Sequence, residues 1–461
     1  MSPAANGPSR VSRRQFLGLV GVAAGATTLA GCSAAGWGFR GSSSGTTELT
    51  YALWDAVQQV GYQKSIDEFQ RRNPDIHVTI EQIPYGNYQQ KITAQYISGD
   101  APDVFWVNTP WLGDWAKGGL LTDVAPRVKS AGIDLGQYIP SLVDLHRDGS
   151  KLWGLPKDWD TIAIYYNKQH LEKAGFRNAP TDLSWNPSDG GSYLHFLKQI
   201  TIDHKGRNAL DAAFDPGSID VYAIASTNEF QAIYGSYMAM NGGGMLPHPY
   251  ATSSILDSKA NRETMTFLTD MLRSAHVVVP NGETGPNGDS TNSQTIFSSG
   301  RMAMWQAGDW NTGALSGLSN FKVGVMPLPS GPKGRISVIN GLTDGIVSNT
   351  KHPNEAWRLV KWLGSADSQR IMGGGGYIWP AIKSLDPLFQ TYWKKKGVDV
   401  SPFLTEAQDH TVNFPVGTGM NEALNNVTTA LGPTFLGTKS VTAGLASAQD
   451  ILNYRISYQS S

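Results

Sequence analysis

The sequence has almost no cysteine. Cys32 is the only cysteine among 461 residues, so no disulfide can form within the chain and no metal site can be built from several thiolates. The nine histidines are scattered, without the close pairing that zinc sites use. We therefore expect no metal and no cofactor. Stability must come from a large hydrophobic core, which a chain of this length can supply.

The chain also has no marked excess of positive or negative charge. The chain has 37 lysines and arginines against 38 aspartates and glutamates, and its formal net charge is −1. Binding to nucleic acid rewards concentrated positive charge, so we expect no nucleic-acid partner. With 40% hydrophobic and 16% charged residues, the composition predicts a globular body.

The apolar segment near the N-terminus is short. It runs from Phe16 to Leu29, is interrupted by glycines, and cannot span about 30 Å of hydrocarbon as a helix. The segment follows the twin arginine Arg13-Arg14 and ends directly before Ala30-Gly31-Cys32. A single thiol after small residues predicts acylation of that cysteine.

Together, the twin arginine and the cysteine resemble the leader of a bacterial lipoprotein exported by the Tat pathway. The resemblance implies a signal peptide at residues 1–31, then a lipidated Cys32 and a flexible Gly/Ser-rich tether over residues 32–47. The protein is then expected outside the cytoplasm, lipid-anchored to the cell membrane. An ordinary membrane anchor or a chance match is the alternative.

The rest of the chain is long enough for two lobes. Without residues 1–31, which carry three arginines and no acid, 430 residues remain and the formal net charge falls from −1 to −4. One domain typically has roughly 150 residues. No charge run or proline-rich linker divides residues 50–461, which favours two lobes joined by several crossings of the chain.

Apolar periodicity predicts strands that alternate with helices. The order strand–helix–strand–helix–strand in the first part predicts a doubly wound α/β lobe. Strands are predicted at 49–54, 76–81, 104–107, 152–155, 162–166, 302–305, 322–326 and 343–347. Helices are predicted up to residue 72, around 88–96, and at 168–174, 192–203, 229–241, 258–275, 353–363, 366–372, 421–431 and 441–456.

Aromatic residues stand beside aspartate or asparagine at the ends of several predicted strands. In open α/β sheets, ligands bind at these carboxyl ends. A sugar packs its C–H faces on aromatic rings, while its hydroxyl groups need carboxylates and amides. The pattern therefore indicates a sugar site. The segments concerned are Trp54-Asp55, Asn108 with Trp111, Asp158-Trp159-Asp160, Asp309-Trp310, and Tyr377 with Trp379.

Several segments of the chain also carry a family resemblance through their order and spacing. They are Ser98-Gly99-Asp100-Ala101-Pro102-Asp103-Val104, Gly118-Gly119-Leu120-Leu121, Gly154-Leu155-Pro156 with Ile164-Tyr165-Tyr166-Asn167-Lys168, Gly300-Arg301-Met302-Ala303-Met304, and Pro353-Asn354-Glu355-Ala356-Trp357 before Pro380-Ala381. With them the chain resembles the extracellular solute-binding proteins of ABC importers, in the maltose-binding-like group (family 1), over residues 48–456. The segment after Trp106 lacks that group's charged pair, so the resemblance does not extend to maltose itself.

The resemblance implies a two-lobed α/β fold of the periplasmic-binding-protein type II, with doubly wound sheets in each lobe and a hinge of several strands. Crossings are expected near residues 157–160, 340–342 and 378–381. The lobes close around ligand by hinge bending. Lobe 1 is expected at 48–157 plus 341–378, and lobe 2 at 158–340 plus 379–461.

The implied function is capture of a carbohydrate in the cleft between the lobes and delivery to the membrane permease of an ABC transporter. The protein is expected to be a monomer and not an enzyme. Ligand-binding residues implied by the matched segments are Trp54, Asp55, Asn108, Trp111, Asp158, Trp159, Asp160, Trp305, Trp310, Asn340, Asp344, Tyr377 and Trp379.

Three other functions stay open. Asp158 and Asp160 lie roughly 6.5 Å apart on one side of an extended segment, between the spacings of retaining and inverting glycosidases. A secreted glycoside hydrolase, however, sets its two acids on opposite sides of the scissile bond. A metal-binding receptor ranks low, and a non-sugar polar solute such as a glycerophosphodiester is compatible with the same family.

Replacing the acylated thiol tests the predicted anchor. The variant Cys32→Ser should be released into the medium as a competent binder, because it lacks the atom that carries the lipid. Fractionation of cells and medium measures this. Retention of the variant at the membrane would contradict the prediction.

Overall fold

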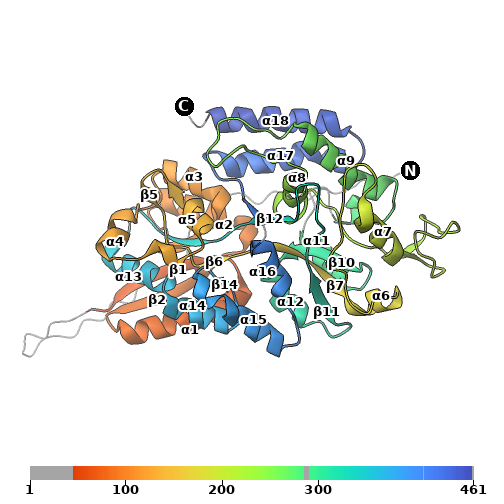
Figure 1. The fold of residues 1–461 in the computed structure, drawn as a ribbon. Helices are drawn as coiled ribbons and strands as arrows, with labels where there is room; N and C mark the ends of the chain where they lie inside the picture. Colours follow the sequence, from red (N-terminus) through yellow and green to blue (C-terminus); the bar gives the residue numbers. More distant parts are fainter. Residues whose placement is uncertain (1–44, 285–289, 409, 459–461) are drawn as a thin grey trace, which may run out of the picture. The chain divides into compact units, whose positions relative to one another are not determined.

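Two β-sheets, each flanked by helices, organise the chain (Figure 1). The computed structural model describes residues 45–284, 290–408 and 410–458. The predicted leader, Cys32 and the tether up to residue 44 lie outside these residues.

The first sheet has four strands, and two neighbouring parallel strands have their carboxyl ends at the same edge. Its order is β13 (Thr343–Ile346), β3 (Val104–Val107), β1 (Thr47–Leu53) and β2 (Ile76–Gln82). Strand β1 is parallel to β2 and β3, whereas β13 is antiparallel to β3. All four residues of β3 are buried, as expected for a strand covered on both faces.

Helix α1 (Ala56–Arg72) begins directly after β1 for a local reason. The carboxylate of Asp55 accepts hydrogen bonds from the N–H groups of Val57 and Gln58, at 2.8 and 2.9 Å, and so caps the helix. The cap turns the chain sharply after β1 and leaves Trp54 at the strand's carboxyl end.

The second sheet is built around β7 (Ile162–Asn167). This strand is antiparallel to both of its neighbours, β10 (Met304–Gly308) and β11 (Val323–Met326). Parallel bridges from Tyr222 to Met302 and from Ile224 to Val278 extend the sheet beyond β10. The two sheets with their helices confirm the predicted two-lobed α/β fold.

Helices and short strands complete the structure. The other helices are α2 (Tyr85–Ser98), α3 (Thr109–Lys117), α4 (Ala125–Ser130), α5 (Pro140–Leu145), α6 (Lys168–Lys173), α7 (Gly191–Ile200), α8 (Gly235–Met240), α9 (Lys259–Arg273), α10 (Asn281–Thr284), α11 (Ser290–Ser298), α12 (Thr312–Ser316), α13 (Pro353–Leu363), α14 (Ala366–Gly374), α15 (Asp386–Lys395), α16 (Ser401–Gln408), α17 (Met420–Phe435) and α18 (Val441–Tyr458). The short strands are β4 (Arg147–Asp148), β5 (Lys151–Leu152), β6 (Asp158–Trp159), β8 (Ile202–Asp203), β9 (Ile219–Val221), β12 (Ile336–Ile339), β14 (Trp379–Pro380) and β15 (His410–Asn413). Within the described part of the chain, no helix is long and apolar enough to cross a membrane.

Two hydrophobic clusters form the core. One contains buried residues of β1, β2, β3 and α13, and the other contains buried residues of β7, α9, α17 and α18. Helices α17 and α18 pack side by side (Figure 1), and α17 also contacts α3. Helix α15 packs against α14. The C-terminal part of the chain therefore touches elements of both sheets.

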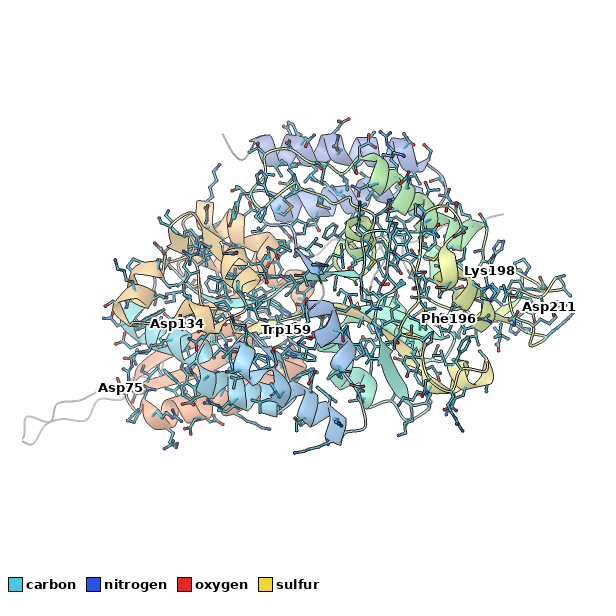
Figure 2. All side chains as sticks on the ribbon, in the orientation of Figure 1. Asp75, Asp134, Trp159, Phe196, Lys198 and Asp211 are labelled. Atoms are coloured by element: carbon cyan, nitrogen blue, oxygen red, sulfur yellow. The ribbon has the colours of Figure 1, made fainter. Side chains whose placement is uncertain are left out.

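Extended segments connect the two sheets. Asp160 bridges to Asn340, and Pro156 bridges to Thr343 of β13, while β6 pairs antiparallel with β14. The segment from Pro156 into β7 therefore has a partner strand on each side. Trp159, in this segment, lies between the two groups of elements (Figure 2).

A buried ion pair fixes this junction to the first sheet. The ammonium of Lys157 lies 3.2 Å from the carboxylate of Asp344, and both side chains are almost fully buried. The same ammonium sits 3.8 Å from the ring centre of Trp106. The hydroxyl of Tyr51 donates a 2.8 Å hydrogen bond to Asp344. Burial lowers the pKa of Lys157 and raises that of Asp344, and their mutual attraction opposes both shifts.

Some predicted elements differ from those observed. The strand predicted at 152–155 is only β5, because within the described chain it pairs with the two-residue strand β4 alone. The helix predicted at 229–241 is divided into a π-helical turn, Phe230–Tyr234, and α8. The strand predicted at 302–305 is β10, which begins two residues later and reaches Gly308.

Removing one partner of the buried pair tests its structural role. Lys157→Met should lower the free energy of unfolding by about 3–5 kcal/mol, because it leaves the Asp344 carboxylate buried and uncompensated. Denaturant unfolding measures this, with Lys351→Met, at an exposed position, as the control. The double variant with Asp344→Asn should recover much of the loss. A double variant as unstable as the single one would contradict the proposed pairing.

Candidate functional site

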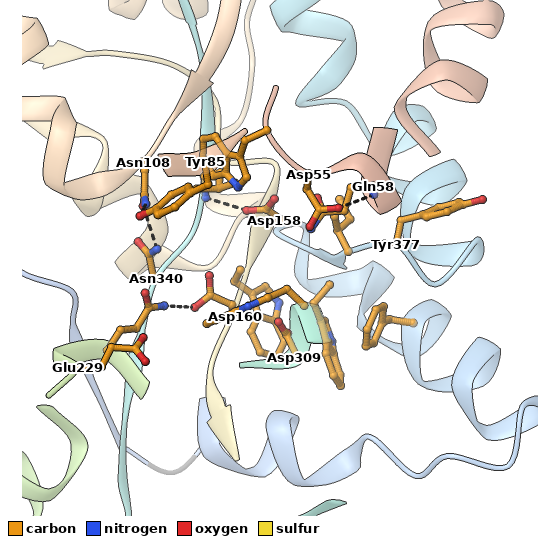
Figure 3. A pocket seen from close by; sticks show the side chains of 18 residues that line it. Asp55, Gln58, Tyr85, Asn108, Asp158, Asp160, Glu229, Asp309, Asn340 and Tyr377 are labelled. Carbon is orange, nitrogen blue, oxygen red and sulfur yellow. Dashed lines mark hydrogen bonds between the residues drawn. The ribbon is translucent and has the colours of Figure 1, made fainter. Parts of the chain in front are cut away.

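A cavity of about 310 Å³ lies beside the junction between the sheets. This volume is near the lower end of the about 300–1,000 Å³ range of small-molecule sites. Figure 3 shows its lining side chains, which follow strands of both sheets or belong to helices, turns and connecting segments. They belong to Trp54, Asp55, Gln58, Tyr85, Asn108, Asp158, Trp159, Asp160, Glu229, Gln231, Asp309, Trp310, Asn340, Leu342, Tyr377, Ile378, Trp379 and Phe389.

Trp54 forms an aromatic wall at the carboxyl end of β1. Four rings meet it at centroid distances of 4.6 to 5.5 Å, all in edge-to-face geometry. They belong to Tyr85, Tyr88, Trp106 and Trp111. These contacts hold the indole of Trp54 in place before ligand arrives, so little side-chain entropy is lost on binding.

A second aromatic wall follows from strand register. The pairing of β6 with β14 places Trp159 opposite Trp379, and their rings lie 4.7 Å apart at 33°. Phe389 continues the stack at 4.6 Å from Trp379. The indole N–H of Trp159 points to Asp386 at 3.4 Å, and burial raises the pKa of that carboxyl to about 6.

Trp310 is the most exposed tryptophan of the site. It follows β10 in a 3-10 turn (Asp309–Asn311), and 39% of its surface is accessible. Its ring lies over Gly308, where an added Cβ would come within 1.7 Å of the indole. Glycine at this position therefore makes room for the ring, which is free to pack on a bound solute.

Three acidic side chains meet at the junction. Asp158 and Asp160 point to the same side of their extended segment, as strand alternation requires, and Asp309 lies next to Asp160 (Figure 3). Asp158 accepts a 2.7 Å hydrogen bond from the N–H of Leu342. Asp160 accepts one of 2.7 Å from the amide of Gln231.

Burial and mutual repulsion raise the pKa of these acids. Burial raises the pKa of Asp158 to about 6, although Lys157 opposes the shift. For Asp160, burial and then the charge of Asp158 raise the pKa well above its ordinary value. For Asp309, burial acts first and the charges of Asp160 and Asp158 add to it. Each acid thus costs free energy when it is ionised in the empty cavity.

Amide groups connect the first sheet to the junction. Asn108 follows β3 and caps α3, since its Oδ1 accepts a 2.9 Å hydrogen bond from the N–H of Thr109. The same oxygen accepts a 3.1 Å hydrogen bond from Asn340. Thr109 in turn donates to Asn340 at 2.6 Å. On the other side, the π-helical turn carries Gln231, and such turns are frequent at functional sites.

Three polar atoms of lining residues are buried and have no hydrogen-bond partner in the described chain. They are Oδ2 of Asp309, Oε1 of Gln58 and Nε1 of Trp379. The first two accept hydrogen bonds and the third donates one. An unpaired buried polar atom costs roughly 1–3 kcal/mol, so a ligand that offers both donors and acceptors would relieve this cost.

The structure brings ten of the thirteen predicted site residues together on the cavity wall. Their shared feature is a position directly after a strand or in a connecting segment. The ten are Trp54, Asp55, Asn108, Asp158, Trp159, Asp160, Trp310, Asn340, Tyr377 and Trp379.

The other three predicted residues lie elsewhere. Trp305 points into the core, 6.3 Å from the ring of Phe297, because strand alternation turns it away from the cavity. Trp111 is buried behind Trp54 and donates to Asn421 at 3.0 Å. Asp344 is occupied by its ion pair with Lys157.

Eight lining residues were not in the predicted set. Asp309 directly precedes Trp310 at a predicted strand end, which is a signal that could have identified it. The remaining seven come from helices, turns and connecting segments that carry no distinguishing motif. They are Gln58, Tyr85, Glu229, Gln231, Leu342, Ile378 and Phe389.

Comparisons with known proteins agree with this architecture. A sequence profile for the family described as bacterial extracellular solute-binding protein matches residues 55–370. The arabinooligosaccharide-binding protein of Bacillus subtilis is 23% identical over 438 residues, which cover 92% of this chain and 89% of the relative. The crystal structure of M. tuberculosis UspC is 29% identical, with a TM-score of 0.72, over 88% of this chain and all of that one. The GacH receptor of Streptomyces glaucescens is 20% identical, with a TM-score of 0.73, over 89% and 98% of the two chains.

The acidic cluster should make stability depend on pH. Because the pKa of Asp160 is higher in the folded than in the unfolded state, its cost is absent below the unfolded-state value of about 3.9. The cost grows as pH rises from there towards the folded-state value and levels off above it. Asp160→Asn should therefore stabilise the protein more near pH 8 than near pH 5, with a difference of about 1–3 kcal/mol between the two pH values. Thermal or denaturant unfolding at both pH values measures the difference.

Comparing variants at each pH removes the contributions of other groups, such as His146, whose burial lowers its pKa to about 4. Asp144→Asn, at an exposed position, is the matched control and should show no such trend. A stabilising effect of Asp160→Asn that shrinks as pH rises would contradict the prediction.

Proposed function

This chain belongs to the bacterial extracellular solute-binding protein family, and we propose that it is the substrate-binding component of an ABC importer for a carbohydrate. In this function the cavity between the two sheets captures a mono- or oligosaccharide, and the protein delivers it to the membrane permease. Hinge bending at the extended segments would close the two lobes over the solute.

The observation that carries this proposal is the combination of aromatic walls with unpaired polar atoms. Trp54 and Trp310 offer rings for the C–H faces of a sugar. Within the described chain, Oδ2 of Asp309 and Oε1 of Gln58 lack a donor, and Nε1 of Trp379 lacks an acceptor. A hydroxyl group is donor and acceptor at once, so a polyhydroxylated solute supplies what both kinds of atom need.

Relatives support the choice of a carbohydrate. Two proteins of Bacillus subtilis that match this chain are named for the binding of arabinooligosaccharides and galactooligosaccharides. Which sugar this chain takes is decided by its own cavity, because members of one fold differ in ligand. We assign ligand binding to the ten predicted residues on the cavity wall, with Asp309, Gln58, Tyr85 and Gln231 added.

Export and anchoring complete the proposed function. The twin arginine and Cys32 support transport by the Tat pathway, removal of residues 1–31 and acylation of the new N-terminus. A lipid anchor would keep the binding protein near its permease. We propose a monomeric binding protein without turnover of its ligand, with lobe 1 built from residues 48–157 and 341–378 and lobe 2 from 158–340 and 379–461.

A thermal-shift screen against a carbohydrate panel tests the proposed function. A bound sugar at 100 times its dissociation constant should add about 2.7 kcal/mol of stability, and we expect a dissociation constant on the order of 1 μM. Trp310→Ala should weaken the binding of the sugar that responds by roughly tenfold or more, because it removes a stacking surface. Titration calorimetry measures this loss.

Two control measurements separate a loss of binding from a loss of structure. Tyr454→Ala removes an exposed aromatic ring outside the cavity and should leave the affinity unchanged. Trp310→Ala itself should keep the melting temperature of the ligand-free protein, since its ring is partly exposed. Release of reducing sugar from di- or oligosaccharides, abolished by Asp160→Asn, would instead establish a glycoside hydrolase.

A further inference from the structure

The charged groups that line the cavity are all negative. Five lining residues carry a carboxyl group, and among the described residues no lysine, arginine or histidine lines the same space. They are Asp55, Asp158, Asp160, Glu229 and Asp309. A neutral sugar offers hydroxyl dipoles and no positive charge, so it would bring no countercharge to the three acids that meet at the junction, Asp158, Asp160 and Asp309.

Two lysines that contact residues around the cavity are engaged elsewhere. Lys157 is paired with Asp344 on the side of its strand that faces the first sheet, where it also packs against Trp106. Lys64 donates a 3.0 Å hydrogen bond to the hydroxyl of Tyr377 in an exposed position at the rim. Neither ammonium is among the groups that line the cavity.

Asp309, one of the three clustered acids, has a carboxyl oxygen without a hydrogen-bond partner in the described chain. Its side chain is 5% exposed, and its Oδ2 is buried without a hydrogen-bond partner. The charges of Asp160 and Asp158 lie close enough to raise its pKa further than burial does alone. The backbone N–H of Trp310 donates to this carboxyl group, but Oδ2 has no donor, and among the described residues no lysine, arginine or histidine lines the cavity beside it.

A metal ion does not fit these carboxyl groups. In the part of the chain that the structure describes, no three histidine, cysteine, aspartate or glutamate side chains are placed to hold one metal ion. A cation that meets these acids is therefore expected to be an organic group that reaches several of them through separate hydrogen bonds.

We propose that the cavity selects a sugar that carries a free amino group, with the ammonium placed against Asp309, Asp160 and Asp158. This inference rests on the proposed function and names the class of carbohydrate. A primary ammonium has three N–H donors, so it pairs with more than one carboxylate through charge-assisted hydrogen bonds. The hydroxyl groups and ring face of the same sugar would meet Trp379 and Trp310.

The unpaired oxygen Oδ2 of Asp309 favours a primary amine over a quaternary ammonium as the bound group. A quaternary ammonium is bound by aromatic faces and has no N–H, so it cannot donate to Oδ2 of Asp309. In addition, Trp159 and Trp379 stack on each other at 4.7 Å, which leaves fewer free faces for an aromatic cage. Choline therefore serves as a contrasting ligand in the test.

Titration calorimetry on the mature protein near neutral pH compares matched ligands. One series is D-glucosamine, N-acetyl-D-glucosamine and D-glucose, and the second is chitobiose, its diacetyl form and cellobiose. The amino sugar of at least one series should bind about tenfold more tightly, or better, than its neutral and acetylated counterparts. Repeating the titrations in buffers of different ionisation enthalpy should show proton release with the amine only, because the carboxyl groups ionise against the ammonium.

Variants test the assigned contacts. Asp309→Asn and Asp160→Asn should each reduce the ratio of amino-sugar to neutral-sugar affinity by about tenfold. Asp144→Asn, the exposed control, should leave the ratio unchanged. The ratio separates charge recognition from general damage to the site, because misfolding would weaken both ligands alike. Because both Asp309→Asn and Asp160→Asn are measured, the test remains valid if one of them fails to fold.

Different results of these titrations test the amino-sugar inference and the proposed function separately. Neutral sugars that bind as tightly as amino sugars would overturn the inference and support carbohydrate transport. If none of the six sugars binds the folded protein, the amino-sugar inference is also overturned. The thermal-shift screen against the wider carbohydrate panel then shows whether the protein binds any carbohydrate. If choline binds more tightly than glucosamine, the preferred ligand is neither a primary amine nor a sugar. That result would contradict both the inference and the proposed carbohydrate transport.

Discussion

The buried pair of Lys157 and Asp344 is the interaction on which the rest of the site depends. Lys157 belongs to the segment that enters the second sheet, and Asp344 belongs to β13 of the first sheet. Their attraction, strengthened by the low dielectric around Trp106, attaches the segment to the first sheet. Strand alternation then turns Asp158 and Asp160 to the opposite side, into the cavity.

This arrangement trades stability for binding. Three carboxyl groups are held together where water cannot solvate them well, and burial raises the pKa of each. The ligand-free protein carries the cost of their proximity, and a solute that donates to them relieves it. Functional sites commonly keep such destabilising groups because removing them removes recognition. The rigid aromatic walls around Trp54 and Trp379 preorganise the remaining contacts.

Local sequence patterns predicted much of the fold. Strand β3 (Val104–Val107) and helix α13 (Pro353–Leu363) have the predicted boundaries, because continuous burial and a proline-started amphipathic helix are local signals. Ten of the predicted residues lie on the cavity wall, and most of them follow a strand or belong to the short strands β6 and β14. Trp305 and Trp111 could not be excluded by the same reasoning, since the direction of a side chain depends on which face of a strand or helix packs inward.

The sequence by itself determined the alternation of strands and helices, the aromatic and acidic residues at their ends, and the single cysteine after a short apolar segment. Only the tertiary structure decided which of these residues share a cavity. Gln231 reaches it from a π-helical turn, Glu229 from the residue before that turn, and Phe389 from α15. Their positions depend on contacts between segments far apart in the chain, such as the pairing of β6 with β14. No local pattern encodes those contacts, because register between distant strands is set by the packing of the whole core.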